Sequence, residues 1–405
     1  MNLVKFADVI DVNPHRKLEK GELSPYVPMA NLVEGKRTIQ DIDFREYKNS
    51  GSKFINGDTL LARITPCLEN GKTAFVNKLK GNQVAHGSTE FIVLRGKAGI
   101  TDNLFVYYLI RSTNFRNIAI KSMTGSSGRQ RVQISAIENY EFELPSLEEQ
   151  KRIAHILGAL DDKIELNQRM NETLEEIARA IFKSWFVDFD PVRAKMAGKP
   201  HPLPDEVMAL FPDRLVESEL GMIPKGWEVG KLGEEFKVVM GQSPPGSSYN
   251  EEGKGISFFQ GRTDFGFRYP NKRVFCTEPK RFAEVGDTLI SVRAPVGDIN
   301  MAIERCCIGR GVAAVKHKSG RNSYTYYSMM DLNRKFKIFE AEGTVFGSIG
   351  KNEFNSLSII VPSHMLIKIF EKYIEPNDEM ILNNDINNED INDIRNSLST
   401  FWFED

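Results

Sequence analysis

The 405-residue chain is poor in cysteine, and its four cysteines are not arranged to bind zinc or to form a disulfide framework. Cys67, Cys276, Cys306 and Cys307 show no CxxC spacing, so we expect reduced thiols in a protein core. The sequence also lacks a signal peptide and any apolar run long enough to span a bilayer, which predicts a cytoplasmic location and no membrane contact. A net charge of -2 argues against a general nucleic-acid coat but allows local basic faces.

Sequence patterns typical of catalytic sites are present only in part. Asn70–Thr73 resembles the end of a phosphate-binding P-loop, but Pro66 stands where the upstream glycine is required, and a strand-like run follows. Ser243–Gly246 resembles the SPPY motif of adenine methyltransferases but lacks the aromatic residue that stacks on a flipped base. The histidines are scattered, and the adjacent Asp161 and Asp162 are interpreted as a solvated helix face. We therefore predict no catalytic residue, no metal ligand and no cofactor.

The longest regular pattern in the chain lies within residues 147–188. Apolar residues follow one another at alternating steps of four and three, interrupted only by two asparagines. The positions are Ile153, Leu157, Leu160, Ile164, Asn167, Asn171, Leu174, Ala178, Ile181 and Trp185. This heptad seam predicts a long helix that packs against another helix, and the asparagines are expected to fix its register at some cost in stability.

The same seam returns 217 residues later, at the C-terminus. Its positions are Phe370, Ile374, Asn377, Ile381, Asn384, Asn388, Ile391, Arg395, Leu398 and Trp402. Both seam asparagines recur, and SWFVD at the end of the first segment is answered by FWFED at the end of the second. Two unrelated amphipathic helices would not explain these agreements, so we expect the two helices to pack antiparallel along the repeated seam.

The regions before each helix also repeat. GDTLLARITP at Gly57–Pro66 is matched without gaps by GDTLISVRAP at Gly286–Pro295, and each copy is followed by a helix-like run, a glycine-containing loop and a strand that ends in proline. The loops are Thr124–Ser135 and Glu342–Phe354. We predict an α+β fold with two globular domains in a pseudo-two-fold repeat, separated by two long antiparallel coiled-coil helices. The expected order is a first globule at 1–146, a helical region at 147–187, a proline-rich extended connector at 188–224, a second globule at 225–362 and a helical region at 363–405.

Basic and amide side chains gather in the loops of both globules. Arg and Gln can pair bidentately with guanine or adenine, and glycines in the same loops allow close approach to a duplex. The predicted DNA contacts are Arg63, Lys72, Arg129, Gln130, Arg131, Gln260, Arg262, Arg268, Lys272, Arg273, Arg293 and Lys351. Each could instead be a solvated surface charge or a salt-bridge partner, and each could hold phosphate without reading a base. A helix of roughly 40 residues spans about 60 Å, which suits two separated contacts on one face of a duplex.

Several segments together resemble one known family, the specificity subunits of type I restriction-modification systems. They include LPSLEEQKRIAHILGALDDKIELNQ at Leu144–Gln168, FKSWFVD at Phe182–Asp188, IPKGWE at Ile223–Glu228 and ARITPCLENGKTAFV at Ala62–Val76. FFQGRTDFGFRYP, SVRAPVGDIN and CCIGRG in the second globule are also similar. The second helix departs from the pattern because it opens with SHMLIK, at Ser363–Lys368, in place of PxxEQ.

The resemblance implies a subunit that is not itself an enzyme. Each globule would be a target-recognition domain that reads one half of a bipartite double-stranded DNA target, and the two helices would set the spacer. Two methyltransferase subunits would bind the helical region, and restriction subunits would complete the complex. One alternative is a coiled-coil adaptor that binds protein without DNA readout. A second is an enzyme that combines recognition with methyl transfer, against which the missing methyl-donor motifs count.

Overall fold

The computed structural model describes all residues except Met1, 342–346 and Asp405. The described chain forms two compact units. The first unit holds residues 1–168 and 384–405, and the second holds residues 169–383. Each unit therefore contains one of the predicted globules together with part of both long helices. The loop predicted at Glu342–Phe354 lies partly outside the described residues.

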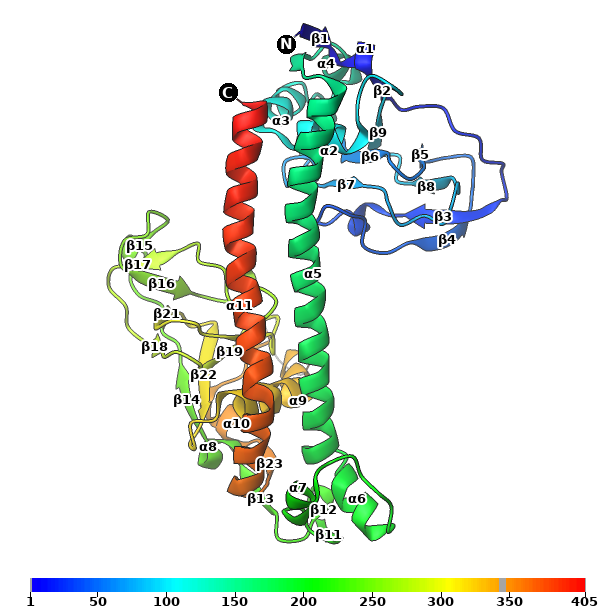
Figure 1. Cartoon of the computed structure of the whole chain (residues 1–405). Helices are drawn as coiled ribbons and strands as arrows, with labels where there is room; N and C mark the ends of the chain where they lie inside the picture. The colour runs from blue at the N-terminus through cyan, green and yellow to red at the C-terminus, as the bar shows by residue number, and fades with distance from the viewer. Residues whose placement is uncertain (1, 342–346, 405) are drawn as a thin grey trace. The chain divides into compact units, whose positions relative to one another are not determined.

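The first globule is built from short strands around two layers of sheet (Figure 1). A four-stranded antiparallel sheet has the order β2-β9-β6-β7, a second has the order β4-β3-β8-β5 with β3 parallel to β8, and β1 pairs with β10. The bounds are β1 Asn2–Lys5, α1 Phe6–Val9, β2 Ile10–Val12, β3 Leu23–Val27, η1 Met29–Asn31, β4 Asp43–Glu46, β5 Lys53–Phe54, β6 Thr59–Ala62, β7 Thr73–Phe75, β8 Ala85–Gly87, β9 Phe91–Gly96, α2 Asn103–Arg111, α3 Thr113–Lys121, α4 Ile134–Glu138 and β10 Glu141–Leu144.

The second globule repeats this topology. Its sheets have the orders β14-β22-β19-β20 and β15-β17-β16-β21-β18, with β16 parallel to β21, and β13 pairs with β23. The bounds are β13 Glu228–Lys231, α8 Leu232–Glu235, β14 Phe236–Met240, η2 Gly246–Ser248, β15 Tyr249–Asn250, β16 Ile256–Phe259, η3 Arg262–Asp264, β17 Phe275–Cys276, β18 Phe282–Ala283, β19 Thr288–Ser291, β20 Ile299–Met301, β21 Cys306–Ile308, β22 Val312–His317, α9 Asn322–Ala341, α10 Lys351–Ser356 and β23 Ser358–Val361. The internal repeat read from the GDTL segments is thus present in the strand order.

The central strands β6 and β19 are buried along their whole length because both of their faces are covered. In β6, Leu61 faces a core that includes α2, whereas its neighbour Leu60 faces a separate core under β3 and β5. In β19, Ile290 and Leu289 divide in the same way between two cores. Helix α2 packs against β6, β7 and β9, and α9 packs against β19, β20 and β22. The sheet and its helix therefore fix the loops that follow β6 and β19.

The two long helices are α5, Leu147–Phe186, and α11, His364–Phe403, each of 40 residues. Within the first unit, Asn167 Nδ2 donates to Asn388 Oδ1 at 2.9 Å. Within the second unit, Asn171 Nδ2 donates to the carbonyl oxygen of Ile381 at 3.4 Å. The first unit also pairs Asp161 with Arg395, and the second unit also packs Trp185 against Phe370. Within each unit, rising residue numbers along α5 thus meet falling numbers along α11, so the helices run antiparallel in each unit. All seam positions predicted from the sequence are buried or half-buried.

The first turn of α5 is tied to the globule by Gln150, the last residue of the PSLEEQ segment. Its side chain is fully buried, Oε1 accepts from the Asp102 amide at 2.9 Å, and Nε2 donates to the carbonyls of Ile100 at 3.1 Å and Pro145 at 2.9 Å. Asp102 in turn caps α2 by accepting from two amides of its first turn. One glutamine thus joins the starts of α2 and α5.

Two expectations from the sequence need correction. Asp161 is buried, not solvated, because its carboxylate accepts from Tyr108 Oη at 2.7 Å and from Arg395 Nη1 at 2.7 Å. The proline-rich connector is folded where an extended segment was expected: it forms α6 Asp190–Met196, α7 Asp205–Ala209 and a hairpin of β11 Leu215–Ser218 with β12 Gly221–Pro224. Pro191 stands at the start of α6 and Pro204 is the N-cap residue of α7, where a missing N–H costs little.

Most of the cysteines lie in the protein core, as free thiols. Cys276, Cys306 and Cys307 are buried free thiols, as expected, and Cys67 is half-buried. Burial raises the pKa of Cys306 to about 12, so this thiol stays protonated and unreactive near neutral pH. Within the part of the chain that is described, no helix is long and apolar enough to cross a membrane.

Candidate nucleic-acid interface

Three loops of the second globule meet at a cleft of about 580 Å³. The loop after β16, the loop after β19 and the β21–β22 connection contribute to it. Its lining residues are Gln260, Gly261, Arg262, Thr263, Arg293, Ala294, Pro295, Arg310 and Gly311. The structure therefore brings together three residues selected from the sequence, Gln260, Arg262 and Arg293, and adds Arg310.

Glycines hold the β21–β22 connection close to the loop after β16. The amide of Gly311 donates to the Gln260 carbonyl oxygen at 3.1 Å, and the amide of Gly309 donates to Phe259 at 2.9 Å. A Cβ atom at Gly311 would lie 2.3 Å from the Gln260 carbonyl oxygen, so no larger residue fits without a shift. Arg310, between the two glycines, is thereby fixed at the edge of the cleft.

The cleft carries a local positive charge. Arg310 is exposed, and its Nε donates to Ser243 Oγ at 3.2 Å. Arg262 forms an ion pair with Asp298 at 2.8 Å, whereas the exposed Arg293 side chain has no ion pair among the described residues. No carboxylate is among the lining residues. Three guanidinium groups and one amide at a concave surface suit an anionic ligand with hydrogen-bonding edges, such as the backbone and bases of a nucleic acid.

In the first globule, the loop with Arg129, Gln130 and Arg131 is joined by its backbone to the segment after β6. The Gln130 carbonyl accepts from the Thr65 amide at 3.0 Å. Arg131 binds Glu90 through two nitrogens, at 3.0 and 2.7 Å, and this bond lowers the pKa of the Glu90 carboxyl. Arg129 is exposed, and its side chain makes no hydrogen bond or ion pair among the described residues. Arg129 is therefore freer to contact a ligand than Arg131.

Arg63 lies beside that loop, Lys72 lies just before β7, and both are half-buried. The Arg63 carbonyl accepts from the Val132 amide at 2.9 Å, and Lys72 Nζ donates to the Met29 carbonyl at 3.4 Å. In the second globule the equivalent backbone bond runs from Ile349 to Val292. Arg63 thus corresponds to Val292 and not to Arg293, although both arginines follow a GDTL strand.

The remaining predicted residues of the second globule do not line the cleft. Lys272 pairs with Glu304 at 2.8 Å, and Arg273 pairs with Asp264 at 2.9 Å, in both cases at the surface. Lys351 is exposed at the start of α10. These three side chains remain accessible, but each lies apart from the cleft-lining set.

The prediction of Arg268 as a DNA contact needs correction. Its side chain is fully buried and pairs with Glu175 on α5 at 3.0 Å and with Asp378 on α11. Its guanidinium also lies 3.7 Å from the centre of the Tyr326 ring. A buried and fully engaged guanidinium cannot reach a duplex without leaving its core site. The sequence suggested otherwise because Arg268 stands among exposed basic and aromatic residues.

A further hollow in the first globule was not anticipated from the sequence. It has a volume of about 660 Å³ and lies where β3, the β4–β5 loop and the β8–β9 connection meet. Arg45 lies over the Tyr26 ring at 4.1 Å, and Lys48 also lines the hollow. His86, which also lines the hollow, is buried, and this burial lowers the pKa of its ring. Tyr26, Arg45 and His86 lie on three different strands and Lys48 lies in a loop, with no shared motif, so no sequence signal marked them.

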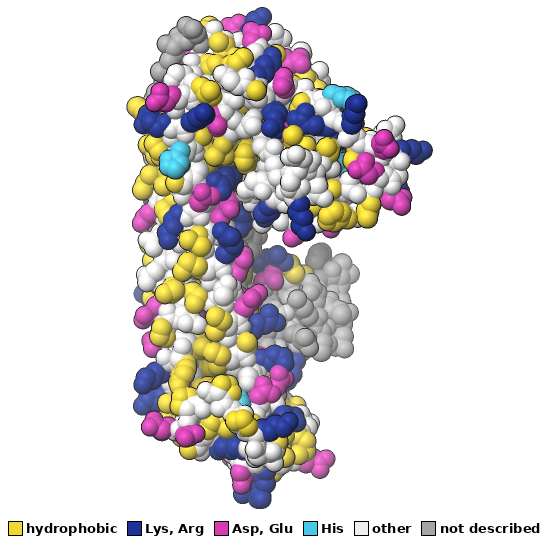
Figure 2. All heavy atoms as spheres, turned by 45° about the vertical axis from the view of Figure 1, so that its right-hand side comes forward, with side chains coloured by type: hydrophobic (Ala, Val, Ile, Leu, Met, Phe, Trp, Pro, Cys, Tyr) yellow, Lys and Arg dark blue, Asp and Glu magenta, His cyan; other side chains and the backbone are white. Residues whose placement is uncertain are grey.

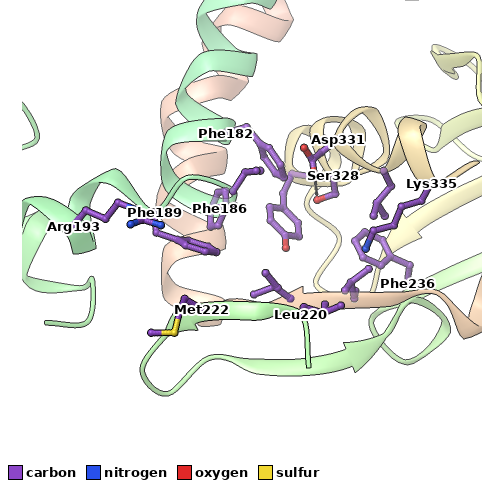
Figure 3. Close-up of a pocket in the computed structure, with 15 residues that line it drawn as sticks. Phe182, Phe186, Phe189, Arg193, Leu220, Met222, Phe236, Ser328, Asp331 and Lys335 are labelled. Atoms are coloured by element: carbon purple, nitrogen blue, oxygen red, sulfur yellow. Dashed lines mark hydrogen bonds between the residues drawn. The ribbon is translucent and has the colours of Figure 1, made fainter. Parts of the chain in front are cut away.

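A different kind of hollow lies in the second unit, at the end of α5 (Figure 3). It has a volume of about 500 Å³ and is lined mainly by apolar side chains, among them Phe182, Phe186, Phe236 and Met222. Ser328 points toward it but donates its hydroxyl to the Tyr324 carbonyl at 2.6 Å. Among the described residues, no group of three His, Cys, Asp or Glu side chains could hold a metal ion.

Lys and Arg side chains are interspersed with Asp and Glu over the face drawn in Figure 2.

The family model and the similar proteins found for this chain all point to one family. The model of the type I restriction modification DNA specificity domain matches residues 1–176 and 224–389. The specificity subunit assigned to the MjaX type I restriction enzyme of Methanocaldococcus jannaschii is 31% identical over 344 residues, covering 84% of this chain and 76% of that protein. The HindI specificity subunit of Haemophilus influenzae is 27% identical over 403 residues, covering 84% of each chain.

A solved structure shares the fold. The S subunit of a type I restriction-modification system from M. genitalium superposes with a TM-score of 0.59 at 16% identity, covering all of this chain and 96% of the other. At this low identity, the superposition shows only that the two chains share a fold. The family match spans both globules and most of both helices, and the chain therefore belongs to the family of type I restriction-modification specificity subunits.

Proposed function

We propose that this chain is the DNA-reading subunit of a type I restriction-modification complex, in which each globule reads one half of a bipartite double-stranded target. Family membership makes DNA target recognition its function, and it disfavours a protein adaptor without DNA readout. The observation that carries the proposal is the second-globule cleft, where Arg262, Arg293 and Arg310 converge with Gln260. This set combines charge for phosphate with donors and acceptors for base edges.

The first globule is proposed to read the other half-site through the Arg129–Arg131 loop and the hollow that contains Arg45 and Lys48. The antiparallel helices are proposed to set the spacer between the half-sites. Two methyltransferase subunits are the proposed partners along the helices, and restriction subunits complete the complex. The relatives named above are described as subunits of restriction enzymes, and the chain is proposed to be non-catalytic when alone.

The cleft can be tested by changing Arg310 to Ala in the assembled methyltransferase complex. If Arg310 pairs with a guanine, DNA affinity should fall by about 1–3 kcal/mol and discrimination should be lost at one base of one half-site. If it holds phosphate only, binding should weaken evenly across sequences, and the salt slope should fall by about one unit.

Filter binding on duplex libraries at several salt concentrations separates these results. Arg305→Ala is the matched control, because Arg305 is an exposed arginine of the same globule that pairs with Glu284 outside the cleft. Unchanged affinity, specificity and salt dependence for both Arg310→Ala and Arg293→Ala would exclude the cleft as a DNA contact.

A further inference from the structure

The buried cluster around Arg268 joins the second globule to both long helices. Arg268 Nη1 donates to Glu175 Oε1 of α5 at 3.0 Å, and Arg268 Nη2 donates to Asp378 of α11. Both terminal nitrogens also donate to Tyr327 Oη at 3.2 Å, and Tyr327 Oη donates to Asp378 Oδ1 at 3.3 Å. Burial raises the pKa of Glu175 and of Asp378, an effect that Arg268 opposes. We call this set the Arg268 cluster: Glu175, Arg268, Tyr326, Tyr327 and Asp378.

A corresponding cluster joins the first globule to α5 in the first unit and, through the ion pair of Asp161 with Arg395 at 2.7 Å, to α11. Arg37 Nη1 donates to the Gly158 carbonyl at 3.1 Å, and its other nitrogens pair with Asp162 and, at 3.5 Å, with Glu165. Next to it, Tyr108 Oη donates to Asp161 Oδ2 at 2.7 Å. The Arg37 side chain is only 8% exposed, although its surroundings in the sequence suggest a surface loop. We call this set the Arg37 cluster: Arg37, Tyr108, Asp161, Asp162 and Glu165.

The two arginines occupy the same place in the repeated fold. The Arg37 carbonyl accepts from the Phe75 amide at 2.8 Å, and the Arg268 carbonyl accepts from the Met301 amide at 2.9 Å. Phe75 and Met301 are themselves equivalent, since each pairs with the threonine of its GDTL strand.

The partners of the arginines repeat as well. Tyr108 and Tyr327 stand at the same position of α2 and α9, five residues after the first residues Asn103 and Asn322, and each donates to a helix aspartate. Those aspartates, Asp161 and Asp378, are 217 residues apart, which is the offset of the helix seam.

The Arg268 segment also reaches the proposed DNA cleft. Arg262 stands six residues before Arg268 and lines that cleft. The segment between them is fastened to β20, because Asn300 Nδ2 donates to the Gly266 carbonyl at 3.1 Å. Asp298, the residue that precedes β20, pairs with Arg262 at 2.8 Å. A continuous set of short contacts thus runs from the helix acids through Arg268 and β20 to a cleft arginine.

From these observations we infer that Arg37 and Arg268 are positioning residues: each sets how its DNA-reading globule is held on the helix pair, and so sets which spacer length the subunit accepts. The inference rests on the proposed bipartite readout. One additional base pair moves a half-site by about 3.4 Å and turns it by about 35°, so a globule held rigidly should reject it. Loss of the cluster should relax spacer choice without altering the bases read, because Arg268 and Arg37 do not face the duplex.

The test replaces the charged members of one cluster together, as E175Q/R268M/D378N, in the full chain assembled with its methyltransferase subunits. A variant that removes only one partner of a buried ion pair often fails to fold, because the other charge stays buried without a partner. Removing the three charges together avoids this. Methylation is measured on duplexes that carry the half-sites mapped for the unchanged complex, with the native spacer and with one base pair more or fewer. The preference for the native spacer should fall about tenfold, a change equivalent to about 1.4 kcal/mol.

Base preferences at both half-sites should stay the same, and R37M/D162N should relax the spacer in the same way from the first unit. R305M, an exposed arginine of the second unit, is the matched control and should leave the spacer profile unchanged. R268K, which keeps the charge but cannot bridge both acids, should fall between the unchanged chain and the triple variant.

An unaltered spacer profile in R268K and R37M/D162N overturns the inference, even if the triple variant does not assemble. Altered base choice at one half-site also overturns it, because Arg268 would then act as a reader. Failure of the underlying function looks different: the unchanged complex would then methylate no bipartite site at all.

Discussion

His317 shows how burial alters a single titratable group. The side chain is 2% exposed, lies between the rings of Phe236 and Tyr324, and shares a hydrogen bond with Ser319 Oγ at 2.6 Å. Burial lowers its pKa to about 4, although Glu235 lies 3.7 Å away and would favour the charged ring. The second unit therefore holds a histidine that is neutral throughout the physiological range.

The pKa of His317 makes stability depend on pH in a defined window. Its pKa is about 6.5 in the unfolded chain and about 4 in the fold, so the unfolded state binds more protons between these values. The stabilisation is fully present above pH 6.5 and is lost as pH falls toward 4, by about 2 kcal/mol at pH 5. Thermal unfolding should show that the unchanged chain is less stable at pH 5 than at pH 7. This loss of stability should be smaller in His317→Gln. His155→Gln, at an exposed site on α5, should behave like the unchanged chain; equal pH dependence in all three would contradict the assignment.

The sequence alone did not predict which single arginines of the second globule are buried and which line the cleft. Arg262 and Arg268 look alike in the sequence, six residues apart in one basic and aromatic segment, yet one lines the cleft and the other is a core residue. The difference comes from long-range partners, Glu175 and Asp378, that no local pattern reveals. Arg310 was missed for the opposite reason, since a lone arginine between glycines is a weak signal until Gly311 is seen against Gln260.

At the level of elements, the helix pair was predictable because its signal is repeated many times. The heptad seam from Ile153 to Trp185 lies wholly within α5, and its copy with Asn384 and Asn388 lies wholly within α11. The connector was not predictable, because proline density reports where a helix cannot continue but not where short helices begin. Burial of Phe189, Val192 and Phe211 in the second-unit core outweighs the preference of that segment for an extended chain.

The asparagine pair of the seam should lower the stability of the helix pair but fix its register. Asn167 and Asn388 are both buried and bonded to each other at 2.9 Å. Asn167→Leu alone leaves Asn388 without this partner and should cost about 1–3 kcal/mol in the free energy of unfolding. N167L/N388L should recover that loss, because two apolar residues suit a seam, but should loosen the register and widen spacer tolerance or alter assembly.

Denaturant unfolding of the two variants, followed by spacer profiling of each assembled complex, provides the measurement. Both half-sites should keep their base preferences, since neither asparagine lies in a globule. Thr173→Leu, on the exposed face of α5, is a helix control that should leave spacer choice unchanged. A double variant that is less stable than Asn167→Leu would argue that the pair contributes more than register.

At the scale of the whole molecule, the repeat carries the function. The sheet that contains the GDTL strand has the same order in both globules, and the other sheet differs by the added strand β15. Both globules present loops after the GDTL strand and after the strands of the parallel pair. The side chains on those loops differ: the first globule offers the Arg129–Arg131 loop, whereas the second offers the three-arginine cleft. A shared scaffold with different loops is suited to reading two different half-sites. The repeat was evident from Gly57–Pro66 and Gly286–Pro295, but the loop contacts depended on packing between distant segments.

The measurement that tests this modular readout most directly is methylation mapping of DNA from cells that carry the assembled complex. The unchanged chain is compared with R129A/Q130A in the first globule and R293A/R310A in the second, with Arg305→Ala as the surface control. Each pair of changes should alter base preference in one half-site only, and the two variants should affect opposite half-sites while the spacer stays constant. A loop variant in one globule that changes the bases read at both half-sites would contradict independent reading by the two globules.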